Sequence, residues 1–136
     1  MNKINNICIS ISYDGSDFFG SQSQLNLRTV QSEVSKKLDL IFGNYHDLTF
    51  ASRTDKGVNA DLQYFGFKKS DIDTSEIFLK FNFLSKNLPN DIIVRKICLM
   101  PNGFNVRKHV SKSIQLAFRH CCFSKIVTIS NLNFLI

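Results

Sequence analysis

The sequence has 136 residues, a formal net charge of +6, 43% hydrophobic residues and thirteen phenylalanines. This balance is typical of one globular domain with a real core, and it excludes disordered and collagen-like chains. No apolar run approaches the roughly 20 residues that a transmembrane helix needs, and the first residues lack a signal-peptide pattern. We therefore expect no membrane contact and a cytoplasmic location.

The first half of the chain predicts a strand followed by a helix. Residues 7–13 alternate between large apolar and smaller side chains, which indicates a half-buried strand. Residues 14–17 follow as a turn. Residues 29–42 are predicted to be helical, with Thr29 as N-cap and Gly43 just beyond the C-terminus. The apolar stripe of this helix consists of Val30, Val34, Leu38 and Ile41.

The second half predicts two strands, a helix and a last strand. The strands are expected at 47–52 and 62–67, with a polar loop at 53–61 between them. A helix is expected at about 74–86, opened by a capping box of Asp73 and Glu76, and a strand at 92–99. The apolar stripe of this second helix consists of Ile77, Phe81, Leu84 and Leu88.

The predicted order of elements, β-α-β-β-α-β, is that of the ferredoxin-like fold. The fold class is therefore α+β, an antiparallel sheet with two helices on one face. Many unrelated functions use this architecture, so the fold alone does not indicate one.

Charge and cysteine content give weaker indications. Residues 101–136 carry five Lys or Arg and no acid, which suits a polyanion such as nucleic acid, although a solvated basic tail explains it equally well. The four cysteines are Cys8, Cys98, Cys121 and Cys122, and they form no C-x-x-C motif. We expect free thiols, no metal site and no disulfide.

The loop at 53–61 carries the most informative chemistry. It contains Arg53, Asp55 and Gly57 between two strands that hold its ends. An arginine at this spacing can pair with the carboxylate or with a phosphate, and the carboxylate can act as proton acceptor or nucleophile. A simple surface turn with an ion pair is the alternative interpretation.

Five blocks in order resemble the tRNA pseudouridine synthase A family. The segment 52–60, S-R-T-D-K-G-V-N-A, is similar to the family pattern G-R-T-D-x-G-V-H-A. Residues 13–20, Y-D-G-S-D-F-F-G, resemble its Y-D-G-[ST]-x-[FY]-x-G opening. Gln22 and Gln24 match its Q-x-Q, with the T-V-Q of the helix start at 29–31. The blocks at 88–92 and 104–107 resemble L-P-x-D-I and F-H-A-R.

The resemblance implies an isomerase that converts uridine to pseudouridine in the anticodon stem-loop of tRNA, at positions 38–40, without metal or cofactor. It implies that Asp55 is the catalytic aspartate, which either attacks C1′ or removes a proton from C2′. Arg53 would position Asp55 and contact the flipped nucleotide. It further implies a homodimer. The remaining residues implied in RNA binding are Thr54, Gly57, Asn59, Gln22, Gln24 and Arg107.

The sequence departs from the family pattern in several places. Ser21 replaces a tryptophan, and Asn59 and Asn105 replace histidines, so neither asparagine is expected to titrate. Gln115 falls where the family has a tyrosine that stacks on the uracil. We therefore expect a family-like N-terminal domain at 1–113, a divergent tail at 114–136, no second half, and activity impaired by this truncation.

Two further interpretations stay open. One is a non-catalytic RNA-binding module, since residues 63–68, Q-Y-F-G-F-K, resemble the aromatic strand of RNA-recognition motifs. In that strand Phe65 and Phe67 share one face, so they also suit a core. The other is an inactive remnant that only self-associates. Candidate phosphate contacts are Arg28, Lys36, Lys37, Lys56, Lys68 and Lys69.

Overall fold

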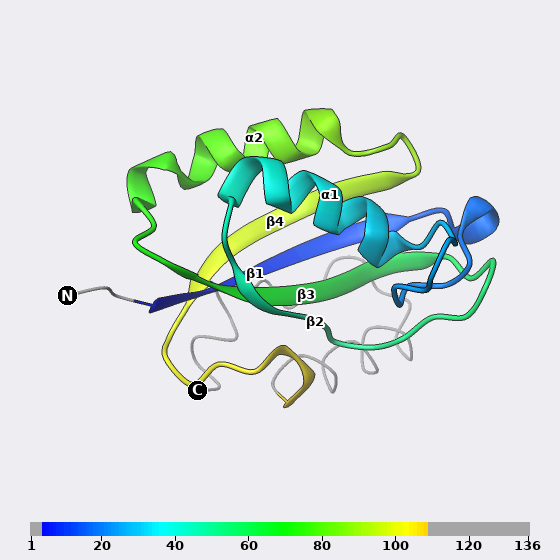
Figure 1. Cartoon of the computed structure of the whole chain (residues 1–136), viewed down its shortest axis with the longest axis horizontal. Helices are drawn as coiled ribbons and strands as arrows, with labels where there is room; N and C mark the ends of the chain where they lie inside the picture. The colour runs from blue at the N-terminus through cyan, green and yellow to red at the C-terminus, as the bar shows by residue number, and fades with distance from the viewer. Residues whose placement is uncertain (1–3, 109–136) are drawn as a thin grey trace.

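The structure is a computed structural model that describes residues 4–108 (Figure 1). The predicted domain boundary at 113, the tail at 114–136 and Gln115 lie outside these residues. The described elements are β1 (Ile4–Tyr13), a 3-10 turn η1 (Gly15–Asp17), α1 (Val30–Phe42), β2 (His46–Phe50), β3 (Ala60–Ser70), a 3-10 turn η2 (Thr74–Glu76), α2 (Ile77–Asn87) and β4 (Ile92–Met100).

The four strands form one antiparallel sheet in the order β2-β3-β1-β4. Both helices lie on the same face of this sheet, as Figure 1 shows. This arrangement confirms the predicted α+β sandwich with ferredoxin-like connections. Tyr13, the last residue of β1, pairs with Ala60, the first of β3. The start of the loop after β1 and the end of the loop before β3 therefore lie side by side.

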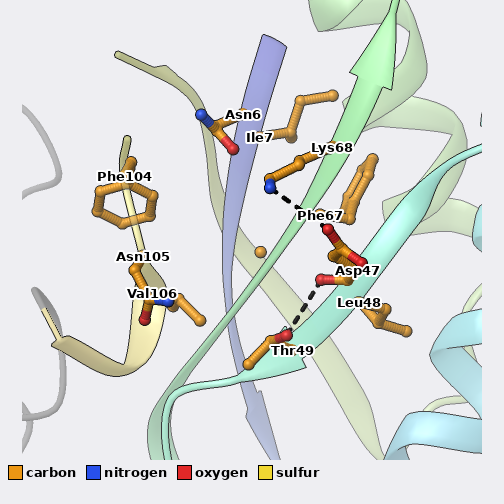
Figure 2. A pocket seen from close by; sticks show the side chains of 11 residues that line it. Asn6, Ile7, Asp47, Leu48, Thr49, Phe67, Lys68, Phe104, Asn105 and Val106 are labelled. Atoms are coloured by element: carbon orange, nitrogen blue, oxygen red, sulfur yellow. Dashed lines mark hydrogen bonds and ion pairs between the residues drawn. The ribbon is translucent and has the colours of Figure 1, made fainter. Parts of the chain in front are cut away.

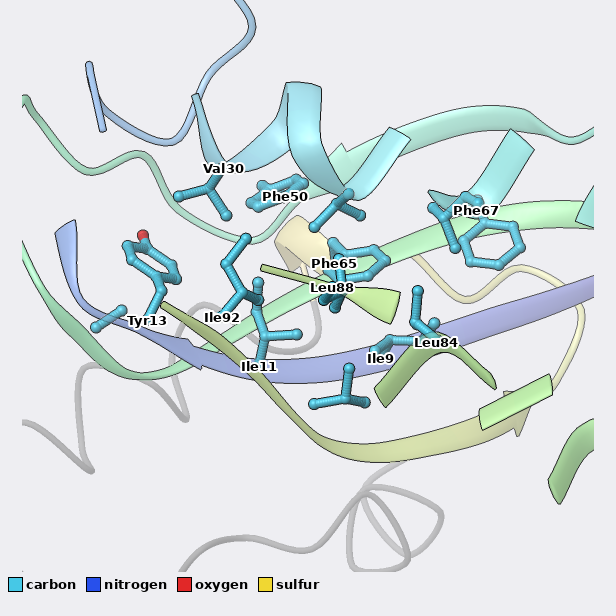
Figure 3. Close-up of a cluster of buried hydrophobic side chains, with 14 of the residues drawn as sticks. Ile9, Ile11, Tyr13, Val30, Phe50, Phe65, Phe67, Leu84, Leu88 and Ile92 are labelled. Atoms are coloured by element: carbon cyan, nitrogen blue, oxygen red, sulfur yellow. The ribbon is translucent and has the colours of Figure 1, made fainter. Parts of the chain in front are cut away.

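The main core lies between the sheet and the helices, where the alternating residues of β1 meet the stripes of α1 and α2 (Figure 3). Phe65 and Phe67 of β3 belong to this core and are at most 2% exposed. Burying one such side chain contributes roughly 1.5–3 kcal/mol. Neither ring is free to stack on a base, so the interpretation of 63–68 as an RNA-binding aromatic strand is wrong.

The two helices begin differently. Thr29 and Ser32 form a reciprocal capping box at the start of α1, as the N-cap prediction requires. The capping box predicted for Asp73 and Glu76 is wrong. The Asp73 carboxylate instead accepts hydrogen bonds from the backbone N and Oγ of Ser75. This local bond favours a 3-10 turn, and α2 begins only at Ile77.

The edge strand β2 is irregular. Asp47 has a φ of 59°, in the left-handed region, and the pairing with β3 changes register between His46 and Thr49. The Asp47 carboxylate also pairs with Lys68 at 3.3 Å.

Neither helix of the segment 4–108 has the length and apolar character required to cross a bilayer.

Candidate active site

The predicted catalytic loop packs against the loop that follows β1. Ser21 holds Thr54 at two points: the Ser21 N–H donates to the Thr54 carbonyl at 3.0 Å, and the Ser21 hydroxyl accepts from the Thr54 N–H at 2.9 Å. The Gly57 N–H donates to the Phe18 carbonyl at 3.2 Å. These bonds fix the backbone on both sides of Asp55.

Side chains add two further ties between these loops. The hydroxyls of Tyr13 and Thr54 lie 2.7 Å apart in a hydrogen bond. The Asn59 side-chain oxygen accepts from the Gly15 N–H at 2.8 Å. Asn59 therefore joins the two loops through a hydrogen bond that needs no titratable ring, which fits asparagine at this position.

Glycine is required where the two loops come closest. A Cβ on Gly15 would lie 1.9 Å from the Val58 carbonyl oxygen, and one on Gly20 would lie 2.8 Å from the Thr54 carbonyl oxygen. Gly57 has a φ of +78° in a turn closed by the Val58 N–H on the Asp55 carbonyl. This is the third position of a type II turn, which favours glycine.

Both loops are also anchored to the rest of the domain, the loop after β1 by α1 and the loop before β3 by Gln63. The first backbone N–H groups of α1, from Val30 and Gln31, donate to the carbonyls of Gly20 and Ser21. The Gln63 side chain is 1% exposed and bonds both to the backbone and to the hydroxyl of Ser52. Helix α1 therefore holds the loop after β1, and β3 holds the residue that leads into 53–59.

Asp55 and Arg53 are both exposed at this rigid end. Within residues 4–108, neither side chain takes part in a hydrogen bond or ion pair. The ion pair between Arg53 and Asp55, one of the options that their spacing allows, is therefore not formed in this structure. An exposed carboxylate on a fixed turn can act as a nucleophile or proton acceptor, and an unpaired guanidinium can bind a phosphate.

The other predicted binding residues occupy different places. Gln24 faces the same loop region, where its Nε2 donates to the Phe19 carbonyl at 2.6 Å. Gln22 is exposed next to Ser21. Arg107 comes from beyond β4, and its Nε donates to the carbonyl of Phe50, the last residue of β2. Arg107 is thus tied to the end of β2, whereas Gln22 and Gln24 belong to the loop after β1.

A groove of about 500 Å³ lies at the opposite end of the sheet (Figure 2). Its polar side chains bind one another or the backbone. Lys68 pairs with Asp47, the Thr49 hydroxyl donates to the Asp47 carbonyl, and Asn6 donates to the carbonyl of Pro101. Of the residues predicted to contact RNA, the groove is lined only by the candidate phosphate contact Lys68, and Asp55 and Arg53 do not line it.

The described residues contain no group of three or more His, Cys, Asp or Glu placed to hold a metal ion. Cys8 and Cys98 are free thiols on adjacent strands. Burial raises the pKa of both thiols, so they are poor nucleophiles at neutral pH. Cys121 and Cys122 lie outside the described residues.

Sequence reasoning missed Tyr13 and Ser21 as parts of this site. Tyr13 fits the alternation of β1 and was expected only in the core, and Ser21 stood out only as a departure from the family pattern. Their contacts with Thr54 join residues 41 and 33 positions apart. The one sequence signal that could have indicated a role in the site was the position of Tyr13 in the Y-D-G block.

Several proteins named tRNA pseudouridine synthase A match this chain. It is 40% identical over 108 residues to tRNA pseudouridine synthase A of Fervidobacterium nodosum, an alignment covering 79% of this chain and 44% of that protein. It is 42% identical over 106 residues to that of Thermosipho melanesiensis, covering 78% and 43%. It is 38% identical over 106 residues to that of Brachyspira hyodysenteriae, covering 76% and 41%.

The chain thus spans less than half the length of these curated relatives. No protein-family model matches it. The resemblance found from the five sequence blocks is confirmed.

Proposed function

We propose that this chain, which is homologous to tRNA pseudouridine synthase A over 108 of its 136 residues, isomerises uridine to pseudouridine in tRNA. Its target would be the anticodon stem-loop at positions 38–40. The observation that carries the proposal is the exposed Asp55 on a turn held from two sides by backbone hydrogen bonds. The enzymes named above supply the reaction class.

In the proposed reaction, the target nucleotide leaves the base stack, at a cost of a few kcal/mol. The bond between N1 and C1′ breaks, the base turns, and C5 bonds to C1′ while the C5 proton is lost and N1 gains one. Asp55 either attacks C1′ or removes the C2′ proton and later returns it. Both routes need an ionised carboxylate held against the sugar, which a fixed turn supplies.

Arg53, with its free guanidinium, is proposed to bind a phosphate of the displaced nucleotide. Thr54 and Asn59 act through the loop contacts described above, and Gly57 permits the turn. Gln22, Gln24 and Arg107 are proposed RNA contacts. These assignments are supported by their positions in the matching sequence blocks.

The test is pseudouridine formation on an unmodified tRNA anticodon stem-loop, read by mass spectrometry. Asp55→Asn should abolish product while RNA affinity changes less than about threefold. Asp61→Asn is the matched control, because Asp61 is exposed in β3 and close to the loop in sequence. Product formation by Asp55→Asn at the wild-type rate would contradict the catalytic assignment and leave RNA binding without catalysis.

Residues 1–113 are proposed to form the family-like domain and 114–136 a divergent tail. Since the chain spans less than half of its relatives, we expect slower turnover than a full-length relative shows in the same assay. We also propose that it forms a homodimer, which light scattering at increasing concentration would test. A monomer at all concentrations would contradict that part alone.

A further inference from the structure

Phe18 and Phe19 are consecutive in the chain, and each has a cation over its ring. Phe18 is 1% exposed, and the Arg28 guanidinium lies 4.1 Å from its ring centroid. Arg28 is itself bound in a bidentate pair to Asp91, at 2.8 and 3.1 Å. Phe18 is therefore buried in the domain, and the Arg28 guanidinium already has a carboxylate partner.

The second pair is open to solvent. Phe19 is 38% exposed, and the Lys56 ammonium lies 4.6 Å from its ring centroid. Lys56 is exposed and forms no ion pair with any residue that the structure describes. The Phe19 backbone is nevertheless fixed, because its N–H donates to the Arg28 carbonyl and its own carbonyl accepts from Gln24. The backbone that carries the ring is therefore held in place, and part of the ring beside Lys56 stays exposed to solvent.

This open pair lies against the candidate catalytic turn. Lys56 directly follows Asp55, and a Cβ on Gly20 would lie 3.6 Å from the Asp55 carbonyl carbon. Four of the eight exposed large apolar residues of the described chain come from these two loops. They are Phe19, Leu25, Leu27 and Val58.

We propose that Phe19 and Lys56 form a nucleotide-binding platform beside Asp55, on which a base of single-stranded RNA stacks. A flat base uses the exposed aromatic ring, and its phosphate uses the adjacent ammonium, so one nucleotide satisfies both side chains. A purely apolar protein partner would leave the Lys56 charge without a partner. The inference rests on the proposed function, since it assumes an RNA ligand at this site.

The chain contains no tryptophan, so Phe19→Trp adds a single tryptophan at the platform, which can be excited selectively over the three tyrosines. Phe83→Trp is the matched control, because Phe83 is 49% exposed and lies on α2. We would titrate each variant with a dye-labelled, unmodified anticodon stem-loop and follow dye anisotropy and tryptophan fluorescence together. Bound RNA should quench the fluorescence of Phe19→Trp by more than half and leave that of Phe83→Trp nearly unchanged.

The outcomes separate the two proposals. RNA binding without quenching of Phe19→Trp would overturn the platform and leave the proposed function intact. No RNA binding by the wild-type chain would overturn both. Phe19→Ala should weaken RNA binding roughly 5- to 150-fold, as expected for the loss of one base stack, while Phe19→Tyr should bind within about twofold of wild type. Equal weakening by both, with unchanged thermal stability, would also contradict stacking.

Discussion

The two ends of the sheet satisfy their polar groups in different ways. At the loop end, backbone groups of residues 15–21 and 54–59 bind one another, and the side chains of Arg53, Asp55 and Lys56 form no ion pairs within residues 4–108. At the groove end, the charged side chains of Asp47 and Lys68 bind each other. The candidate catalytic loop is therefore held by its own backbone and leaves charged side chains exposed, whereas the groove lies at the end where the charges pair with each other.

The largest expected effect concerns the glycines of the two ends. Gly15→Ala places a methyl group against the backbone of Val58, so we expect a loss of about 3 kcal/mol in unfolding free energy and loss of isomerisation. Gly66→Ala, at the groove end, puts a Cβ 3.3 Å from the Ile7 carbonyl oxygen and should cost about 1 kcal/mol or less. Urea denaturation would measure both, and equal costs would contradict the comparison.

Removing the Ser21 hydroxyl should have the next largest effect. Ser21 is 1% exposed, and Ser21→Ala leaves the Thr54 N–H without its acceptor, which should cost about 2 kcal/mol. Hydrogen exchange at the Thr54 amide should accelerate, while the exposed control Ser23→Ala should change neither quantity. Unchanged exchange at Thr54 in Ser21→Ala would show that this bond does not hold the loop.

Alkaline pH should weaken the sheet face that carries the groove. Burial raises the pKa of Cys8 well above its ordinary 9.0 and that of Tyr64 to about 12. Both groups stay protonated in the folded state while the unfolded chain begins to lose protons, so their stability contribution is intact below about pH 9 and lost above it. Between pH 8 and pH 10 we expect a loss on the order of 1–2 kcal/mol in unfolding free energy.

Cys8→Ala is the control for the pH dependence. It removes the contribution of Cys8, so the same change of pH should cost this variant less unfolding free energy than the wild type. A wild-type stability that stays flat from pH 8 to pH 10 would contradict the burial of these groups.

The smallest expected effect is at the Asp47–Lys68 pair. The two side chains are 68% and 46% exposed, so Lys68→Ala should change stability by less than about 1 kcal/mol. It should also leave RNA affinity within about twofold, whereas Lys56→Ala should reduce it several-fold. Filter binding at one fixed salt concentration would compare them. An equal loss from both variants would place RNA at both ends of the sheet.

The fold was predictable because its signals are local. The alternation of 7–13 and the stripe from Val30 to Leu38 are set by the periods of strand and helix, and both appear where expected. The start of α2 was not predicted correctly, because Asp73 binds Ser75 instead of capping the helix. Such short polar contacts compete closely in energy, and sequence pattern does not separate them.

The candidate site was predictable only in part. The loop around Asp55 was found from its motif, and the resemblance was confirmed. The residues that hold this loop in place were not predicted. Ser21 and Tyr13 contact Thr54 only after the sheet and α1 bring distant segments together. The exposure of Phe19 beside the burial of Phe18 likewise depends on where Arg28 and Lys56 come to lie.

The irregular backbone at Asp47 has a consequence for the protein in concentrated solution. Fibrils grow when flat sheet edges from separate molecules add strand upon strand. At the β2 edge, one residue in the left-handed region and a charge on the margin interrupt the regular row of free N–H and C=O groups. Within residues 4–108 this edge offers no continuous template, so we expect it to be a poor site for adding strands from other copies.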